Sequence, residues 1–256
     1  MAPALTITIQ TFSDTVCPWC YIGKKNLDKA IETYKEQNPN VEFEVTWNPF
    51  YLHPEAKISA YKKKDYIAAR FGPSRAAAFR ERVDKGAAAK GLSINWDGLC
   101  GNTRDSHVLL LLAQELQQQQ QQQQQHRQQQ EGGGDSNSSS NSNNNNNNNN
   151  LLRETQDALF HGAFHRGQDV SDRAFLAEVA LEVGLCGSED EVLARLDEEG
   201  VRTEADALDR RAKEVVGITA VPSYVVQGRY RVGGQQESEV FLRLFERIRL
   251  EGRERQ

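Results

Sequence analysis

The stretch Cys17-Pro18-Trp19-Cys20 lies between two segments whose apolar residues recur with different periods. Upstream, residues 5–9 alternate branched apolar and polar side chains, which predicts a β-strand. Downstream, apolar residues recur at helical spacing from Ile22 to Tyr34, which predicts an α-helix. The two cysteines therefore lie where a strand ends and a helix begins. There the first N–H groups of the helix have no intrahelical partner, and the helix dipole favours negative charge.

This position favours a pair of thiols that exchange with disulfides. A thiolate at Cys17 is stabilised by the start of the helix, and Cys20 lies one turn further along. Pro18 suits the first turn, because its missing N–H removes no intrahelical hydrogen bond there. In thiol–disulfide exchange a thiolate attacks a substrate disulfide, and a second thiol resolves the mixed disulfide. We expect Cys17 to be the nucleophile and Cys20 to be the resolving thiol.

Two other interpretations of this pair stay open. A structural zinc site needs two more Cys or His ligands at similar spacing, whereas Cys100 and Cys186 stand alone in the sequence. A pair of inert core cysteines is the second alternative, but the position between strand and helix favours exchange. We therefore expect no metal and no bound cofactor. The redox-active pair is itself the reactive group, with glutathione as an alternative co-substrate.

Size and charge narrow the classes of function. The 256 residues are enough to bury a sizeable core. The formal net charge of −5 argues against nucleic acid or an anionic membrane as the main partner. The sequence contains no apolar run of membrane-spanning length. Residues 1–5 lack the basic residues and the long apolar run of a secretory signal. We therefore expect a cytoplasmic protein with no membrane partner.

The remaining periodicities predict a βαβ unit, then helices, then an αββα unit. Residues 41–47 alternate and predict a second strand. Helices are expected after Ser74 and Asp172, and after Ser188, which opens a capping-box pattern. Thr203 is the expected N-cap of a later helix that stops at Gly217.

The C-terminal part of the chain predicts a hairpin and a closing helix. Strands are expected over residues 221–226 and 230–232, joined by a turn at Gln227-Gly228. Residues 237–250 carry apolar side chains along one helical face, which predicts an amphipathic helix.

A low-complexity tract interrupts the helical block. Glutamine fills most of residues 117–130, and a Gly, Ser and Asn-rich segment follows as far as Asn150. Such composition offers no apolar surface to offset the entropy of ordering, so we expect residues 117–150 to be disordered. Because glutamine forms helices fairly well, the first glutamines are an alternative extension of the helix that precedes them. We expect no part for this tract in the chemistry.

The sequence resembles the DsbA-like thioredoxin-fold oxidoreductases, and within them the FrnE-type branch. The resemblance covers most of the chain outside the low-complexity tract, and it rests on five segments: Asp14–Lys25, Asn48–Pro54, Asn102–His107, Gly217–Tyr224 and Gly233–Gln235. The two-cysteine segment and the Val221-Pro222 segment are specific as a pair.

The resemblance implies an α/β, thioredoxin-like fold (βαβ … αββα) with a large helical insertion. Residues 1–58 and 201–256 would form the thioredoxin-like domain, and residues 59–200 the inserted helical domain. It also implies that the Val221–Pro222 peptide bond is cis and faces the dithiol, so that the Val221 backbone can pair with an extended substrate. A trans proline at the start of an edge strand is the alternative.

Several neighbours of the dithiol have two interpretations. Trp19 and Tyr21 either contact substrate or pack in the core. Thioredoxin-like proteins often keep a carboxylate near the position of Asp14 that helps to move protons, and a loop cap is the alternative.

Further along the chain, Asn102 is a candidate N-cap, with His107 half buried behind it as an accessory residue. We expect Lys24 and Lys25 to form a solvated face. We expect Cys100 and Cys186 to take no part in the chemistry, and the glycines beside Cys100 leave an exposed, oxidisable thiol there as the alternative.

Three functions remain. The first is a thiol–disulfide oxidoreductase that acts on a disulfide-containing protein or a small thiol. The second is a glutathione-dependent transferase or isomerase. Kappa-class glutathione transferases and 2-hydroxychromene-2-carboxylate isomerases share the fold plan, and they usually have Ser in place of the first cysteine. The third option is a scaffold that assembles through the Gln/Asn tract. The presence of both Cys17 and Cys20 favours the first function, and a homodimer is an open alternative to a monomer.

Overall fold

A four-stranded sheet lies at the centre of the computed structural model, which describes residues 5–57, 60–131 and 150–253. Its strand order is β2-β1-β5-β6. Strands β1 and β2 are parallel, whereas β5 pairs antiparallel with both β1 and β6. The bounds are β1 Leu5–Ser13, β2 Val41–Pro49, β5 Ser223–Val226 and β6 Tyr230–Gly233. This is the βαβ … ββα sheet of a thioredoxin-like fold.

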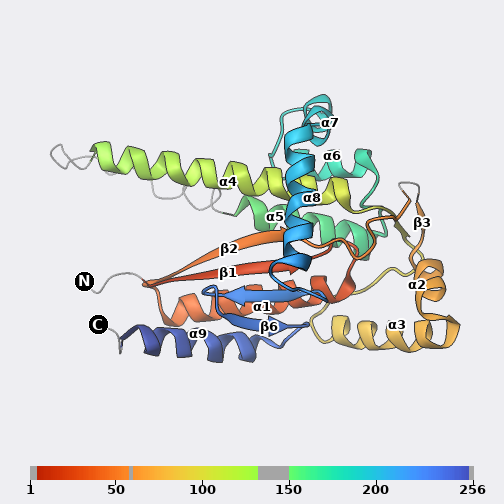
Figure 1. Cartoon of the computed structure of the whole chain (residues 1–256), viewed down its shortest axis with the longest axis horizontal. Helices are drawn as coiled ribbons and strands as arrows, with labels where there is room; N and C mark the ends of the chain where they lie inside the picture. The colour runs from red at the N-terminus through yellow and green to blue at the C-terminus, as the bar shows by residue number, and fades with distance from the viewer. Residues whose placement is uncertain (1–4, 58–59, 132–149, 254–256) are drawn as a thin grey trace.

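Helices cover both faces of the sheet (Figure 1). Helices α1 (Pro18–Gln37) and α9 (Ser238–Arg253) share one core with alternate residues of β1, Ile7 and Ile9. Phe12 of β1 lies in a separate core on the opposite side, with Ala212 of α8 (Glu199–Glu214). Because side chains alternate across a strand, the period of two in β1 supplies apolar contacts to both layers.

A set of helices packs beside the sheet and shares its core. Tyr21 and Trp47 lie in the same buried cluster as Leu109 and Phe160 from this set. The bounds are α2 Lys63–Phe71, α3 Pro73–Ala88, α4 Arg104–Glu131, α5 Leu151–His161, a π-helix Gly162–Arg166, α6 Arg173–Glu182 and α7 Glu189–Leu196. A short pair of strands, β3 (Tyr61–Lys62) and β4 (Leu99–Cys100), lies beside α2. The predicted division at residues 58 and 200 stays a prediction.

Helix starts were predicted well where a side chain caps the first turn. The Asp172 carboxylate accepts from the backbone N–H of Ala174 (3.0 Å), and Ser188 Oγ accepts from that of Glu191 (3.3 Å). The prediction for Thr203 is wrong, because α8 already begins at Glu199 and places Thr203 inside the helix. Its N-cap, Glu198, makes no side-chain capping bond, so no local signal marked this start.

The glutamine run is helical over the described residues. Helix α4 continues from Arg104 to Glu131, so the expectation of disorder is wrong for residues 117–131. The alternative of a prolonged helix is the correct one, because adding a residue to an existing helix costs far less than nucleating one. Residues 132–149, which include most of the asparagines, lie outside the described residues.

The C-terminal hairpin and helix match their predictions. Gln227 and Gly228 both have positive φ angles (52° and 66°), as the tight turn between β5 and β6 requires. Gly217, where a stop was predicted, also has a positive φ of 75° shortly after α8 ends. Helix α9 then returns along α1.

Candidate active site

Cys17 is the residue that precedes the first turn of α1. Its backbone is extended (φ −90°, ψ 112°), and its carbonyl accepts from the N–H groups of Cys20 (3.0 Å) and Tyr21 (3.3 Å). Pro18 follows at the first helical position, as predicted. No side chain caps this helix start, so Cys17 stands at the positive end of the helix dipole without a competing capping group.

Cys20 lies one turn further along and is almost wholly buried. Burial raises the pKa of its thiol well above the usual value, and the adjacent Cys17 sulfur raises it further. Hydrogen bonds with the Ser13 side chain and with the Asp14 backbone lower this pKa. All four cysteines of the chain are free thiols in the structure. The inner thiol is therefore held protonated until it is used.

The loop before β5 brings a distant segment against the outer thiol. The Val221–Pro222 peptide bond is cis, as the resemblance implied. Cys17 Sγ donates to the carbonyl oxygen of Val221 across 3.8 Å, although 204 residues separate the two along the chain. The main chain of Val221 therefore borders the sulfur that we expect to be the nucleophile.

Gly23 allows α1 to approach this loop closely. A Cβ atom at Gly23 would lie 2.5 Å from Tyr224 Oη, which is closer than real Cβ contacts, and 3.0 Å from Pro222 Cγ, which is tighter than most of them. The absence of a side chain at this position therefore lets the dithiol helix and the proline loop pack together. Sequence reasoning missed this role, although Gly23 lies two residues after Tyr21 within the matched segment.

The two aromatic residues of the motif differ in their surroundings. Tyr21 is buried, and its ring stacks on Phe160 (5.4 Å between centroids) and Phe164 (5.7 Å), so the packing interpretation is correct. Trp19 is half buried and meets Phe79 of α3 edge to face at 6.4 Å. Its exposed part leaves contact with a substrate open, which stays a proposal.

Asp14 joins the dithiol loop to α4 and to the chain after β2. Its carboxylate accepts from the N–H of Leu52 (2.8 Å) and lies 3.3 Å from His107 Nε2. Trp47 Nε1 lies 3.1 Å from His107 Nδ1. Since an indole N–H can only donate, Nδ1 is the acceptor, and Nε2 carries the ring proton that is donated to Asp14.

This network corrects one expectation and leaves another open. His107 and Asp14 are both fully buried, so the expectation of a half-buried histidine is wrong. Asp14 Oδ1 also lies 3.4 Å from the N–H of Val16, which matches the loop-cap alternative. A proton-moving role for Asp14 stays untested by these contacts. Asn102 caps α4 as predicted, since its Oδ1 accepts from Arg104 N (2.9 Å).

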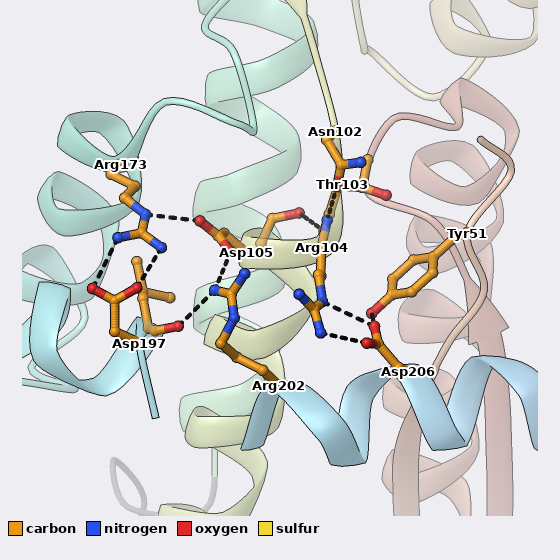
Figure 2. Close-up of polar contacts among 11 residues, drawn as sticks. Tyr51, Asn102, Thr103, Arg104, Asp105, Arg173, Asp197, Arg202 and Asp206 are labelled. Carbon is orange, nitrogen blue, oxygen red and sulfur yellow. Dashed lines mark hydrogen bonds and ion pairs between the residues drawn. The ribbon is translucent and has the colours of Figure 1, made fainter. Parts of the chain in front are cut away.

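A network of arginines and aspartates fixes α8 against α4 (Figure 2). Arg104 donates to Asp206 of α8, and Tyr51 Oη donates to the same carboxylate at 3.2 Å. Asp105 of α4 accepts from Arg202 of α8 (2.7 Å), as Figure 2 also shows. Because α8 leads into the Val221 loop, these contacts help to place that loop beside Cys17.

The same network continues to α6 and to the end of α7. Arg173 Nε donates to Asp105 across 2.8 Å, and its Nη2 donates to Asp197 across 2.7 Å (Figure 2). Asp105 therefore accepts from residues of two helices, α6 and α8, at the start of α4.

The two lysines after the motif do not form a simple solvated face. Lys24 is buried and pairs with Asp28 (2.6 Å) and with Asp157 of α5 (3.0 Å). Lys25 pairs with the same Asp157 carboxylate at 2.7 Å. The expectation was wrong for Lys24, because α5 covers the face of α1 that carries it.

The alternative of an exposed thiol at Cys100 is also wrong. Cys100 is 1% exposed, and its thiol donates to the carbonyl of Tyr61 across 3.6 Å. Burial raises the pKa of this thiol to about 12. The flanking glycines allow close packing here, since a Cβ at Gly101 would lie 2.1 Å from Ser171 Oγ.

Two further observations concern the described residues as a whole. Within residues 5–57, 60–131 and 150–253, no cluster of three or more His, Cys, Asp or Glu side chains is arranged to hold a metal ion. Over the same residues, we find no helix with the length and apolar character needed to cross a bilayer.

The sheet, its flanking helices and the two cysteines at a helix start define a protein of the thioredoxin-fold class. A model of the DSBA-like thioredoxin domain matches residues 8–143 and 146–246. The chain therefore belongs to the DSBA-like thioredoxin domain family.

Individual relatives agree with this assignment. The chain is similar to a probable DsbA oxidoreductase from Streptomyces coelicolor, with 26% identity, a TM-score of 0.68, and coverage of 93% of this chain and 88% of that one. It shares the fold of the cytosolic disulfide reductase DsbM from Pseudomonas aeruginosa, solved with GSH. That match has 14% identity, a TM-score of 0.55, and coverage of 95% and 99% of the two chains.

A curated protein matches over a shorter length. The uncharacterised protein YwbO of Bacillus subtilis (strain 168) is 38% identical over 50 residues. This match spans 20% of the present chain and 22% of YwbO.

Proposed function

We propose that this protein is a dithiol–disulfide oxidoreductase that works through Cys17 and Cys20. The observation that carries the proposal is the pair of free thiols on one helical turn, with Cys17 at the helix start and facing the Val221 carbonyl at 3.8 Å. A fixed array of N–H groups at a helix start stabilises a thiolate without a charged side chain. Cys17 is then the attacking sulfur.

The reaction has two exchange steps. The Cys17 thiolate attacks one sulfur of the substrate disulfide, a new S–S bond forms, and the other substrate sulfur leaves as a thiolate. Cys20 then loses its proton and attacks the Cys17 sulfur, which releases the second substrate thiolate and closes the Cys17–Cys20 disulfide. Two electrons pass to the substrate. A thiol reductant such as glutathione would reopen the enzyme disulfide, and the reverse sequence would oxidise a substrate dithiol.

The two cysteines have different tasks in this sequence. A buried thiol whose pKa is raised stays protonated and does not compete with the outer thiolate for substrate. It also waits beside the sulfur that it must attack. Val221 would bind the substrate main chain next to that sulfur, in the manner of an added strand. Trp19 would supply an apolar contact.

The test is reduction of insulin by the full chain, followed as turbidity with dithiothreitol or glutathione as the reductant. We expect Cys17→Ser to reduce the rate to background, a loss on the order of 10⁴-fold, because the protein loses the thiol that attacks the substrate disulfide. Cys100→Ser is the matched control and should keep the rate. Unchanged activity of Cys17→Ser would refute the proposal.

The glutathione-dependent transferase or isomerase class is the competing outcome. Such an enzyme needs one residue at the helix start to bind or activate glutathione and has no need of a second thiol. Glutathione-dependent conjugation or isomerisation that persists in Cys20→Ser would therefore assign the protein to that class. Insulin reduction that depends on both thiols would exclude it as the main activity.

A further inference from the structure

The outer edge of β2 is not paired with another described strand, and residues 43–46 of this edge lie away from the dithiol. Strand β2 is the end strand of the sheet among the described strands. Trp47 N donates outward, to Gln114 Oε1 of α4 at 2.7 Å, whereas Phe50 N donates inward, to Ser13 O of β1 at 3.1 Å. Alternate residues of a strand direct their backbone groups to opposite sides. The N–H and C=O groups of Phe43 and Val45 therefore also point outward.

A groove of about 700 Å³ runs along this free edge. Residues 43–46 of β2 form one side of it, and α1 and α5 contribute further lining. Helix α4, which lies beside β2 in Figure 1, contributes a row of glutamines: Gln114, Gln117, Gln118 and Gln121. These residues are three or four positions apart, so they share one face of the helix.

The glutamine amides offer the same groups as a neighbouring strand. Each amide has a carbonyl acceptor and an N–H₂ donor. Gln114 already accepts from the edge at Trp47, and Gln117 Oε1 accepts from the N–H of Leu152 (3.0 Å). Gln118 and Gln121 continue the row beside the open part of β2. A chain placed in the groove would find backbone partners on one side and amide partners on the other.

The groove is acidic. Five acidic residues and two basic residues line it: Asp28, Glu32, Glu36, Glu42, Glu44, Lys35 and Arg153. Both basic residues are already paired, Lys35 with Glu42 and Arg153 with Asp28 and Glu32. Glu36 and Glu44 are exposed and form no ion pair with any described residue. Two carboxylates at the rim thus lack a cationic partner.

We propose that the groove between β2 and the glutamine face of α4 binds an extended segment of a basic polypeptide as an added strand. The segment pairs its main chain with Phe43 and Val45, and it places Lys or Arg side chains against Glu36 and Glu44. Main-chain pairing supplies affinity, and the charges select the partner. This surface is separate from the dithiol site and does not depend on the proposed redox activity.

The test uses the full chain and fluorescein-labelled, acetylated peptides of eight residues, with binding followed by fluorescence anisotropy. The first peptide alternates Lys and Val, and the second alternates Glu and Val. A third repeats the Lys-Val sequence with N-methyl groups on alternate residues. We expect the Lys-Val peptide to bind about tenfold or more tightly than either of the others, since they lose the charge pairs or the main-chain hydrogen bonds.

Two variants and one control locate the site. Glu36→Lys with Glu44→Lys should weaken binding of the Lys-Val peptide about tenfold or more. Glu182→Lys with Glu239→Lys makes the same change of charge away from the groove and should leave binding unchanged. Val45→Pro should also weaken binding, because it removes an N–H that points away from β1. Far-UV circular dichroism of each variant reports whether the fold is intact.

The proposal fails if the N-methylated peptide binds as well as the parent, because attraction to an acidic protein then accounts for the affinity. It fails equally if the two pairs of charge reversals weaken binding alike, or if the Lys-Val peptide does not bind. Self-association of the chain that Val45→Pro abolishes, without peptide binding, would assign the edge to a second copy and also overturn the proposal.

Discussion

The start of α1 and the β3–β4 corner, which is formed by residues 61–63 and 99–100, both place a buried thiol near positive charge. At α1 the charge comes from fixed backbone N–H groups, and a second thiol lies one turn away. At the corner it comes from Lys63, a buried side chain whose ammonium group donates to the carbonyl of Leu99.

The corner shows that a nearby cation is not sufficient to make a thiol reactive. Lys63 lowers the pKa of Cys100, but burial outweighs it and raises that pKa to about 12. Burial also lowers the pKa of Lys63 itself to about 8. A helix start cannot lose its polarity in this way, because peptide dipoles do not titrate. The proposed reactivity of Cys17 therefore rests on a permanent source of charge and on a second sulfur within reach.

Of the two features that distinguish the start of α1 from the corner, we test the second sulfur first, because its removal should have the largest effect on the rate of insulin reduction. We expect Cys20→Ser to slow multiple-turnover insulin reduction by on the order of 10²-fold or more, because nothing resolves the mixed disulfide. A covalent adduct of Cys17 with substrate should accumulate and be visible by mass spectrometry. Cys186→Ser, the control, should turn over normally. Full activity of Cys20→Ser would show that the second thiol is dispensable.

Substitution of Asp14 tests how much its hydrogen bonds contribute to holding the dithiol loop in place. We expect Asp14→Ala to lower the free energy of unfolding by about 3 kcal/mol or more, because the buried donors of Leu52 and His107 lose their acceptor. Urea denaturation followed by circular dichroism measures this. Asp97→Ala is the matched control; its carboxylate is exposed, and it should change stability by less than about 0.5 kcal/mol. Equal effects of the two substitutions would contradict the network described here.

Substitution of Lys63 tests how much the buried ammonium group at the corner lowers the stability of the fold. Its pKa is about 8 in the folded protein and 10.5 in its ordinary environment, so the unfolded chain binds the proton more strongly. The gap corresponds to a penalty of about 3 kcal/mol that is complete below pH 8 and disappears as the pH rises through 10.5. We therefore expect Lys63→Met to be more stable than the parent at pH 7.

The pH dependence of the difference between the parent protein and Lys63→Met provides the control. The advantage of Lys63→Met should shrink steadily between pH 8 and pH 10.5, as measured by urea unfolding at each pH. An advantage that did not change over this range would mean that packing, and not the buried charge, causes it.

Cys100 should show the smallest effect. We expect Cys100→Ala to leave the rate of insulin reduction within about twofold and to lower stability by about 1 kcal/mol, since a small buried group is removed. In the native protein iodoacetamide should modify Cys17 while Cys100 remains unlabelled, as mass spectrometry of digests would show. Rapid labelling of Cys100 would contradict its burial.

Local features were predictable because their causes lie within a few residues. The alternation of residues 5–9 marks β1, and the proline after Cys17 marks where α1 begins. The side chains of Asp172 and Ser188 mark helix starts, since each bonds to an N–H two or three residues on. The turn at residues 227–228 followed from the same local chemistry.

Errors arose where contacts between distant segments decided the outcome. Thr203 is a good capping residue, but α8 packs against α4 over a longer stretch and begins earlier. Lys24 looks solvated in sequence until α5 brings Asp157 over it. His107 is buried because Trp47 and Asp14 supply a partner to each ring nitrogen.

The sequence by itself determined the candidate reacting pair, the helix start that carries it and the order of the thioredoxin-like strands and helices along the chain. The tertiary structure alone decided that Gly23 admits the proline loop, that His107 is fully buried, and that β2 keeps an open edge. The physical reason is the distance along the sequence over which each effect acts. Periodicity and capping act over a few residues, whereas burial and pairing depend on segments more than two hundred residues apart that no local pattern records.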